Sequence, residues 1–167
     1  TAADAPAVTQ TAPQSVRDFV ANWEGFESKV YKDTKGIKTI GYGFNLQRAG
    51  AKAAIEAVGL NYSRLINGTA EVSRAQASQL MRADLKEAVS NARTFVSNFD
   101  KLPHDAQLIV VDMAYNMGLA KLSGFQDFKA ALEANDFATA AVEAKDSAWY
   151  NQVGRRSVHH VKKLENM

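Results

Sequence analysis

The chain has 167 residues, of which 46% are hydrophobic and 23% are charged, and this composition excludes a wholly disordered protein. It contains no cysteine, which excludes disulfides, thiolate metal sites and a cysteine nucleophile. Twenty Lys and Arg against eighteen Asp and Glu leave a net charge of +2, too small to indicate a nucleic-acid-binding protein.

The first 14 residues are mostly Ala, Thr, Pro and Gln, a composition typical of a linker. They show neither the basic leader nor the apolar centre of a signal peptide. We expect them to be either a frayed end of the domain or a tether to a longer protein. No apolar run approaches the roughly 20 residues of a membrane-spanning helix, so we expect a soluble domain without a membrane span.

The first predicted element is an amphipathic helix that begins after Ser15. Its apolar residues recur every three to four positions, and Ser15 stands where an N-cap is expected. Gly25 predicts that the helix ends near Glu24. Alternating β-formers over residues 29–43, with turn residues at 33–36, then predict a small β-hairpin or meander, the only sheet signal in the sequence.

The chain after Arg48 has helical patterns. Ser73 and Gln76 form a capping box in front of a long predicted helix that extends to residue 96. Pro103 opens another helix, which Gly118 can close. Shorter helices are predicted at residues 49–58, 124–133, 136–145 and 153–164. These patterns predict an α+β fold, mostly α: a helical bundle with one small β element near its N-terminus.

Two carboxylates flank the junction between the first helix and the hairpin. Glu24 ends a helix rich in aromatic residues, and Asp33 lies in the turn that follows. Cleavage of an acetal bond needs an acid that protonates the leaving oxygen and a second carboxylate that stabilises or hydrates the oxocarbenium-like centre. Partial burial favours a protonated Glu24, and the polar turn favours an ionised Asp33. Thr39, on the returning strand, offers a hydroxyl that can hold a water beside Asp33.

Spacing alone does not select this pair. Most of the eighteen acidic residues are expected to be solvated surface charges. Helical phase does not select Glu24 over Glu27, which would lie nearer the apolar face if the helix continued past Gly25.

Three segments of the sequence resemble the T-even phage type lysozymes. The first has the pattern Glu, eight residues, Asp, five residues, Thr and then Gly-x-Gly, and it extends from Glu24 to Gly43. The second is Tyr-Asn-Met-Gly at residues 115–118, followed by Ser-Gly-Phe ending at Phe125. The third is Ser-Ala-Trp-Tyr-Asn-Gln at residues 147–152. They occur in family order, so the resemblance covers the chain from about Val16 to its end.

The resemblance implies an endo-acting muramidase that cleaves the β-1,4 bond between N-acetylmuramic acid and N-acetylglucosamine in bacterial peptidoglycan. Glu24 then matches the general acid, while Asp33 and Thr39 match the residues that position and activate the attacking water. Family members of this type invert the anomeric centre, which predicts carboxyl groups roughly 6.5–9.5 Å apart. We expect no cofactor and no metal.

The resemblance also implies a lysozyme-like two-lobe fold with further site residues. It divides the chain into a small N-terminal lobe, a long connecting helix and a helical C-terminal lobe, with the cleft between the lobes, at residues 15–73, 74–97 and 98–167. The substrate-binding positions are Tyr42, Gly43, Asn116 and Phe125, and the supporting positions are Trp149 and Arg156. Arg156 matches the arginine that pairs with the general acid if no gap is allowed, and Arg155 matches it if one residue is deleted.

Two positions depart from the family pattern. Phe44 stands where the family usually has His, and we expect altered stability or cleft shape rather than lost activity. Asn116 stands where relatives have Gln, a longer amide, and its own amide is still able to bond an N-acetyl or peptide group.

Other aromatic and histidine residues have structural interpretations. Trp149 and Tyr150 are able to stack on sugars, but aromatics at helical spacing are usually core residues. His159 and His160 are neighbours on a predicted helix, so they point about 100° apart and make a poor metal pair.

Two functional hypotheses follow. The first is a bacteriolytic glycosidase that acts on the bacterial cell wall as a phage endolysin, as a virion-borne lysozyme domain, or as the toxic domain of a bacteriocin or secreted effector. The second is a catalytically silent wall-binding module. The complete set of Glu24, Asp33 and Thr39 favours the enzyme. We expect a monomeric domain, with a possible tether at residues 1–14, that has peptidoglycan and not nucleic acid as its partner.

Overall fold

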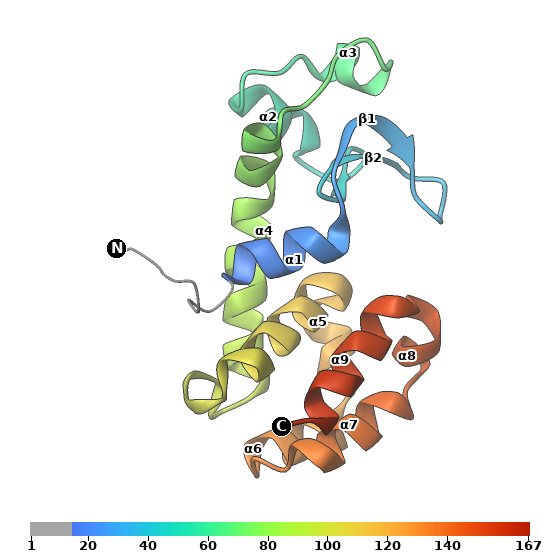
Figure 1. Cartoon of the computed structure of the whole chain (residues 1–167). Helices are drawn as coiled ribbons and strands as arrows, with labels where there is room; N and C mark the ends of the chain where they lie inside the picture. The colour runs from blue at the N-terminus through green and yellow to red at the C-terminus, as the bar shows by residue number, and fades with distance from the viewer. Residues whose placement is uncertain (1–14) are drawn as a thin grey trace, which may run out of the picture. The chain divides into compact units, whose positions relative to one another are not determined.

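The computed structural model describes residues 15–167 of the chain (Figure 1). These residues divide into two compact units. We call residues 20–87 the sheet unit, and residues 15–19 together with 88–167 the helical unit. Helices dominate, and the three-stranded antiparallel sheet lies in the sheet unit, which confirms the predicted α+β class. The proposed linker at residues 1–14 lies outside the described residues.

The first helix and the sheet form as predicted. α1 (Val16–Glu24) is capped by Ser15, whose Oγ accepts a hydrogen bond from the Asp18 N–H at 3.0 Å. Gly25 ends the helix because it has a φ of 76°, in the left-handed region that glycine adopts without strain. The sheet has the strand order β1-β2-β3, formed by β1 (Glu27–Lys32), β2 (Lys38–Gly41) and β3 (Phe44–Asn45).

Three helices complete the sheet unit: α2 (Ala51–Ala57), α3 (Tyr62–Ile66) and α4 (Arg74–Phe95), which continues into the helical unit. The predicted capping box opens α4. The Gln76 N–H donates to Ser73 Oγ at 3.1 Å, and the Ser73 N–H donates to Gln76 Oε1 at 3.0 Å. α3 is not among the predicted helices, because five residues are too few to show a helical period.

The rest of the helical unit consists of a 3₁₀ turn, η1 (Phe99–Lys101), and five helices: α5 (His104–Leu122), α6 (Gln126–Glu133), α7 (Phe137–Lys145), α8 (Ala148–Val153) and α9 (Arg155–Glu165). α5 begins after Pro103 as predicted, and Gly118 interrupts its helical backbone with φ 80° and ψ 164°. Only one helix was predicted in this region, at residues 153–164. The structure has two, α8 and α9, which are separated at Gly154, with a φ of 70°.

Each unit has its own buried core. In the sheet unit, the largest fully buried side chains are those of Ile40, Leu46, Ile55 and Leu65. In the helical unit, residues 108–114 of α5 are all buried, and α7 packs against α6, α8 and α9 (Figure 1). A helix that is buried on every side has no solvated face for a charged residue. Asp112 of α5 is therefore a buried acid. Within residues 15–167, no helix combines the length and apolar character needed to cross a membrane.

Candidate active site

The predicted acid, Glu24, is the last residue of α1 and is half-buried. Its carboxyl group lies against the backbone of Gly43, in the turn between β2 and β3. A Cβ atom built on Gly43 would be 2.5 Å from Glu24 Oε1, and Gly43 has a φ of 77°. Glycine is therefore favoured at this position both by the backbone conformation and by the closeness of the acid.

Asp33 organises the turn between β1 and β2. Its Oδ1 accepts hydrogen bonds from the N–H groups of Lys35 at 2.8 Å and Ile37 at 2.9 Å. The Asp33 N–H donates in turn to the carbonyl oxygen of Ile37 at 2.9 Å. Oδ2 makes no hydrogen bond with residues 15–167. One carboxylate oxygen thus fixes the side chain, and the second is available to a water molecule.

Thr39 lies on β2 and is buried. Its hydroxyl donates to the carbonyl oxygen of Ile37 at 2.9 Å. Because this bond uses the only hydroxyl proton, a further partner of the Thr39 oxygen has to donate to it. Thr39 is therefore suited to accept a hydrogen bond from a water molecule. Asp33 and Thr39 are both tied to Ile37, which places them at the same end of the hairpin.

Tyr31 connects the two carboxylates, although the sequence pattern indicates it only as a strand residue. It pairs with Thr39 across β1 and β2. Burial raises the pKa of Tyr31 above its usual value, and the negative charges of Glu24, Glu27 and Asp33 raise it further. A phenol responds to these carboxylates only when they are near it. The structure thus brings Glu24 and Asp33 to one region of the sheet unit, and it places the alternative acid, Glu27, on β1 with an exposed side chain.

Two aromatic residues of the second turn are packed into the sheet unit. Tyr42, a predicted substrate-binding residue, is buried and has its ring centroid 5.4 Å from that of Phe26. Phe44, at the family's histidine position, is also buried, and the guanidinium of Arg48 lies 4.7 Å from its ring centroid. Arg48 also pairs with both carboxylate oxygens of Asp84, at 2.5 and 2.8 Å. Phe44 is therefore packed into the core of the sheet unit.

The other predicted site residues belong to the helical unit. Asn116 is an exposed residue of α5. Trp149 lies in the core, as predicted, and its Nε1 has no hydrogen-bond partner among residues 15–167. Arg156 is buried on α9, whereas Arg155 is exposed.

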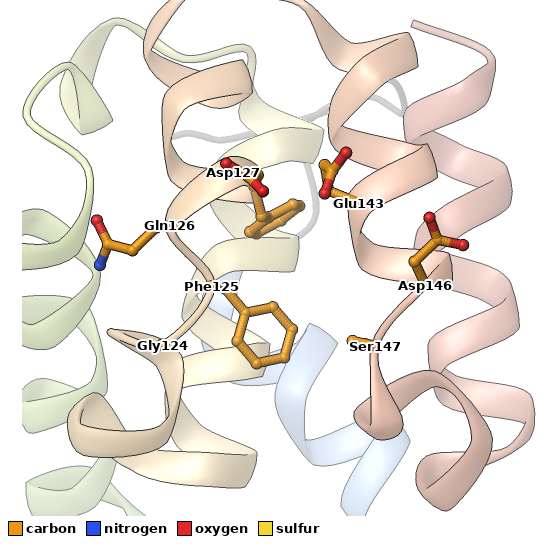
Figure 2. A pocket seen from close by; sticks show the side chains of 8 residues that line it. Gly124, Phe125, Gln126, Asp127, Glu143, Asp146 and Ser147 are labelled. Carbon is orange, nitrogen blue, oxygen red and sulfur yellow. The ribbon is translucent and has the colours of Figure 1, made fainter.

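Phe125 lines a pocket of about 260 Å³ beside α6 and α7. Figure 2 shows the Phe125 ring together with the carboxylates of Asp127, Glu143 and Asp146. The sequence predicts Phe125 as a substrate-binding residue, and the acidic neighbours were not foreseen. The hollow combines two aromatic side chains, those of Phe125 and Phe128, with several acceptor groups. Within the described part of the chain, no three His, Asp or Glu side chains form a group suited to a metal ion.

Arg156 forms a side-on pair with Asp112 of α5. Nε–H donates to Oδ2 at 2.7 Å, and Nη2–H donates to Oδ1 at 2.5 Å. His160 Nε2 lies 2.7 Å from the same Oδ2. Burial acts to raise the pKa of Asp112, but the hydrogen bonds and charges of Arg156 and His160 outweigh it and hold this pKa below its usual value. Asp112 is therefore an ionised carboxylate shared by a guanidinium and an imidazole.

The sequence pattern could indicate Asp112 but not its partners. Asp112 is the only charged residue in the apolar stretch 108–114, and a buried charge needs a partner. Its partners lie 44 and 48 residues later along the chain, and no local pattern connects such distant positions.

Comparison with known proteins identifies the family of the chain. The profile of the family described as phage lysozyme matches residues 21–165. The chain belongs to the phage lysozyme family. It is therefore a glycoside hydrolase of the lysozyme type, as the three sequence segments predict.

The chain is similar to proteins in which the matched part is a very different share of the length. "Probable T4-type lysozyme 2" of Dictyostelium discoideum is 27% identical over 151 residues, which cover 86% of this chain and 89% of that protein. "Pre-baseplate central spike protein Gp5" of Enterobacteria phage T4 is 26% identical over 150 residues, which cover 86% of this chain but only 26% of that protein. "Peptidoglycan hydrolase gp36" of Enterobacteria phage SP6 is 25% identical over 127 residues, or 13% of its length. Similar sequences thus occur both as nearly whole proteins and as parts of longer ones.

Proposed function

We propose that the protein hydrolyses the β-1,4 bond between N-acetylmuramic acid and N-acetylglucosamine in bacterial peptidoglycan, with inversion at the anomeric carbon. The observation that carries this proposal is the common location of Glu24, Asp33 and Thr39 around Tyr31 in the sheet unit. It is supported by family membership and by the name of the SP6 relative, a peptidoglycan hydrolase. A catalytically silent wall-binding module would not need Glu24 packed against Gly43, or a Thr39 hydroxyl whose proton is used by Ile37.

Glu24 is the proposed general acid. Its half-buried position at the end of α1 limits hydration, which favours the protonated carboxyl group. The proton passes from Glu24 to the glycosidic oxygen as the bond between the anomeric carbon and that oxygen breaks. The leaving sugar then departs as an alcohol, and Glu24 is left as a carboxylate.

Asp33 and Thr39 are proposed to hold the attacking water. One O–H of the water donates to Thr39 Oγ1 and the other donates to Asp33 Oδ2, which leaves an oxygen lone pair for the anomeric carbon. As the new carbon–oxygen bond forms, Asp33 accepts the proton of the water. Attack from the face opposite the leaving group gives inversion, and the separation of the two carboxyl groups that this requires is roughly 6.5–9.5 Å.

The remaining site residues keep their proposed roles. Tyr42, Gly43, Asn116 and Phe125 bind substrate, and Trp149 supports the fold around Arg156. We propose Arg156 rather than Arg155 as the supporting arginine, because the buried, doubly bonded guanidinium of Arg156 is already oriented whereas Arg155 is exposed.

The biological role that we favour is that of a phage endolysin or a virion-associated lysozyme domain acting on the bacterial cell wall. The names of the two phage relatives, a spike protein and a peptidoglycan hydrolase, support it. We expect a monomeric catalytic domain over residues 15–167, with residues 1–14 as a linker. The toxic domain of a bacteriocin or secreted effector would use the same chemistry.

A turbidity assay on outer-membrane-permeabilised Gram-negative cells tests the activity. The parent protein should clear the suspension, and Glu24→Gln should abolish clearing while the thermal melt stays nearly unchanged. Glu27→Gln is the matched control, because it removes a nearby carboxylate that is exposed on β1. Clearing by Glu24→Gln at the parent rate would reject Glu24 as the acid. An NMR spectrum of the first-formed anomer would reject inversion if the β-anomer appeared first.

A further inference from the structure

We propose that His159 and His160 form a pH-sensitive contact that stabilises α9 on α5 at neutral pH and breaks when both rings are protonated. We call these two residues the histidine pair. The pair and its partners lie wholly within the helical unit, and the inference does not depend on the proposed function. It rests on the distance between the two rings and on the acceptor with which one of them is bonded.

The carboxylate of Asp112 fixes a hydrogen on one ring nitrogen of His160. His160 Nε2 lies 2.7 Å from Asp112 Oδ2, and both side chains are only 1% exposed. Burial acts to raise the pKa of Asp112, but the bonds from Arg156 and His160 hold it below its usual value. The ionised carboxylate is only able to accept, so Nε2 of His160 carries the hydrogen of this bond.

A single hydrogen fits between the two rings of the histidine pair. Nδ1 of His159 lies 3.0 Å from Nδ1 of His160, the distance of a hydrogen bond in which one nitrogen donates and the other accepts. If both rings are neutral, His160 has its hydrogen on Nε2, so its Nδ1 accepts the Nδ1 hydrogen of His159.

The number of protons bound by the pair decides whether this bond persists. With one additional proton, either ring is an imidazolium, and the two Nδ1 atoms still supply one donor and one acceptor. With two additional protons, both Nδ1 atoms carry a hydrogen, and two donors of like charge face each other. The folded pair therefore binds one proton with its contact intact and loses the contact on binding the second.

The surroundings of the pair determine which ring moves. The His160 ring is buried and stacks on Phe19, with a centroid distance of 5.5 Å and an interplanar angle of 25°, and the Trp149 ring lies 6.1 Å away. The His159 ring is half-buried, with its centroid 6.0 Å from that of Phe19. His159 is thus the ring with access to solvent, and its outward rotation separates the pair. This rotation removes its contact with Phe19 as well as the bond to His160.

Charges from two helices act on His159. Burial lowers its pKa below the usual value, and the positive charges of His160 and Lys163 on α9 lower it further. Asp112 and Asp105 of α5 act in the opposite direction with a smaller effect, and Asp105 lies 3.8 Å from the ammonium of Lys163. The rings that pack on the pair from α1 and α8 are uncharged. The environment therefore favours a neutral His159, as the intact contact requires.

The pair links stability to pH in the mildly acidic range. In the unfolded chain, both histidines bind a proton near their ordinary pKa of about 6.5. Below this pH the unfolded chain binds one proton more than the folded pair with its contact intact, so stability falls as the pH falls. The contribution is fully present above the unfolded pKa and is lost as the pH falls through the lower folded pKa of His159. A difference of one proton changes the ratio of folded to unfolded protein about tenfold per pH unit.

Urea denaturation of the parent and of His159→Asn tests the proposal. The asparagine amide has an N–H and a carbonyl near the position of the imidazole Nδ1, so it is able to bond with His160 in either protonation state, and it does not titrate. Between about pH 7.5 and about pH 5.5, the ratio of folded to unfolded protein should fall about tenfold more in the parent than in this variant.

His104→Asn is the matched control, because it removes the remaining histidine of the chain, an exposed residue at the start of α5. This variant should keep the pH dependence of the parent. Equal pH dependence in the parent and in a folded His159→Asn would overturn the proposal. Folding of each variant is checked by circular dichroism.

Nitrogen-15 NMR of the histidine rings tests the geometry in the parent itself. At neutral pH we expect His160 with a hydrogen on Nε2 and a scalar coupling across the hydrogen bond between the two Nδ1 atoms. This coupling should disappear as the second proton is bound. A neutral His160 with its hydrogen on Nδ1, or a coupling that persists after both rings are charged, would contradict the proposal.

Amide hydrogen exchange tests whether the broken contact loosens α9. After correction for the intrinsic effect of pH on exchange, the amides of α9 should lose protection relative to those of α6 when the parent is acidified. His159→Asn should not show this loss. Unchanged relative protection of α9 in a parent whose two histidine rings are both charged would reject the proposed effect on the helix.

Discussion

The carboxyl group of Glu24 occupies the volume that a side chain at position 43 would need, since a Cβ on Gly43 would lie 2.5 Å from Glu24 Oε1. The turn after β2 and the end of α1 are therefore adapted to one another. The family pattern places a glycine at this position, and the structure supplies a reason for it. The carboxyl group of Glu24, the proposed acid, packs against the backbone of Gly43.

We predict that Gly43→Ala lowers activity far more than stability. The flexible Glu24 side chain can move away from the new methyl group, so the folding cost is mainly the left-handed backbone, about 1–2 kcal/mol. The displaced acid should lower kcat by about a hundredfold. Turbidity clearing and thermal melts measure the two effects. Gly59→Ala is the matched control, because Gly59 has a φ of 87° and a methyl group added there would meet no atom within 4 Å. Equal activity losses in the two variants would contradict the prediction.

Thr39 offers a second test, because its hydroxyl proton is used by Ile37 and only its lone pairs remain for a water. Thr39→Val keeps the shape and removes the acceptor, and we expect kcat to fall by about a hundredfold. Thr39→Ser keeps the hydroxyl and should retain most of kcat, at a cost of about 1 kcal/mol for the buried methyl group. Rates on soluble oligomers distinguish them. If valine and serine were equally active, Thr39 would have no part in holding the water.

Most of the fold was predictable because its boundaries depend on local chemistry. Ser15, Gly25 and the capping box of Ser73 and Gln76 each act within four residues, and each does in the structure what the sequence pattern indicates. The short helices α3 and α8 were not predicted as separate elements, since five or six residues are too few to show a helical period.

The site was predictable where its spacing is local and hidden where it depends on tertiary contacts. Glu24, Asp33 and Thr39 lie within 16 residues of sequence, and a motif describes them. Tyr31 was visible only as a strand residue, because its closeness to both carboxylates depends on the tertiary fold of the sheet unit and not on local spacing. The Asp112, Arg156 and His160 network joins α5 to α9, and only the folded chain shows that the three residues meet.

Asn135 permits a test of the fold that is independent of catalysis. It has a φ of 55°, the only positive φ among the non-glycine residues of the described chain. It ends α6 in a Schellman motif, in which the Asp136 N–H donates to the Ala131 carbonyl at 2.8 Å and the Asn135 N–H donates to that of Leu132 at 3.0 Å. We predict that Asn135→Ala lowers the free energy of unfolding by about 1 kcal/mol and that Asn135→Gly does not lower it. Urea denaturation checks both, and a more stable alanine variant would contradict the prediction.

The lowered pKa of Asp112 predicts how stability depends on pH. Burial acts to raise this pKa, and the bonds from Arg156 and His160 lower it by more, so the unfolded chain binds the proton more tightly than the folded one. The carboxylate therefore contributes its full stabilisation above the unfolded pKa of about 3.9, and the contribution is lost as the pH falls through the lower folded value.

Asp112→Asn has no carboxylate to titrate at this position, so its difference from the parent measures this contribution. At pH 7 we expect the substitution to lower the free energy of unfolding by about 3 kcal/mol, because Arg156 stays buried without its counter-charge. The difference should shrink as the pH falls below about 4. Asp100→Asn breaks an exposed pair with Arg93 and should change stability by less than about 1 kcal/mol throughout. Urea denaturation at a series of pH values gives these differences. A gap between parent and Asp112→Asn that stayed constant to pH 3 would mean that the buried carboxylate is not the group that loses its charge.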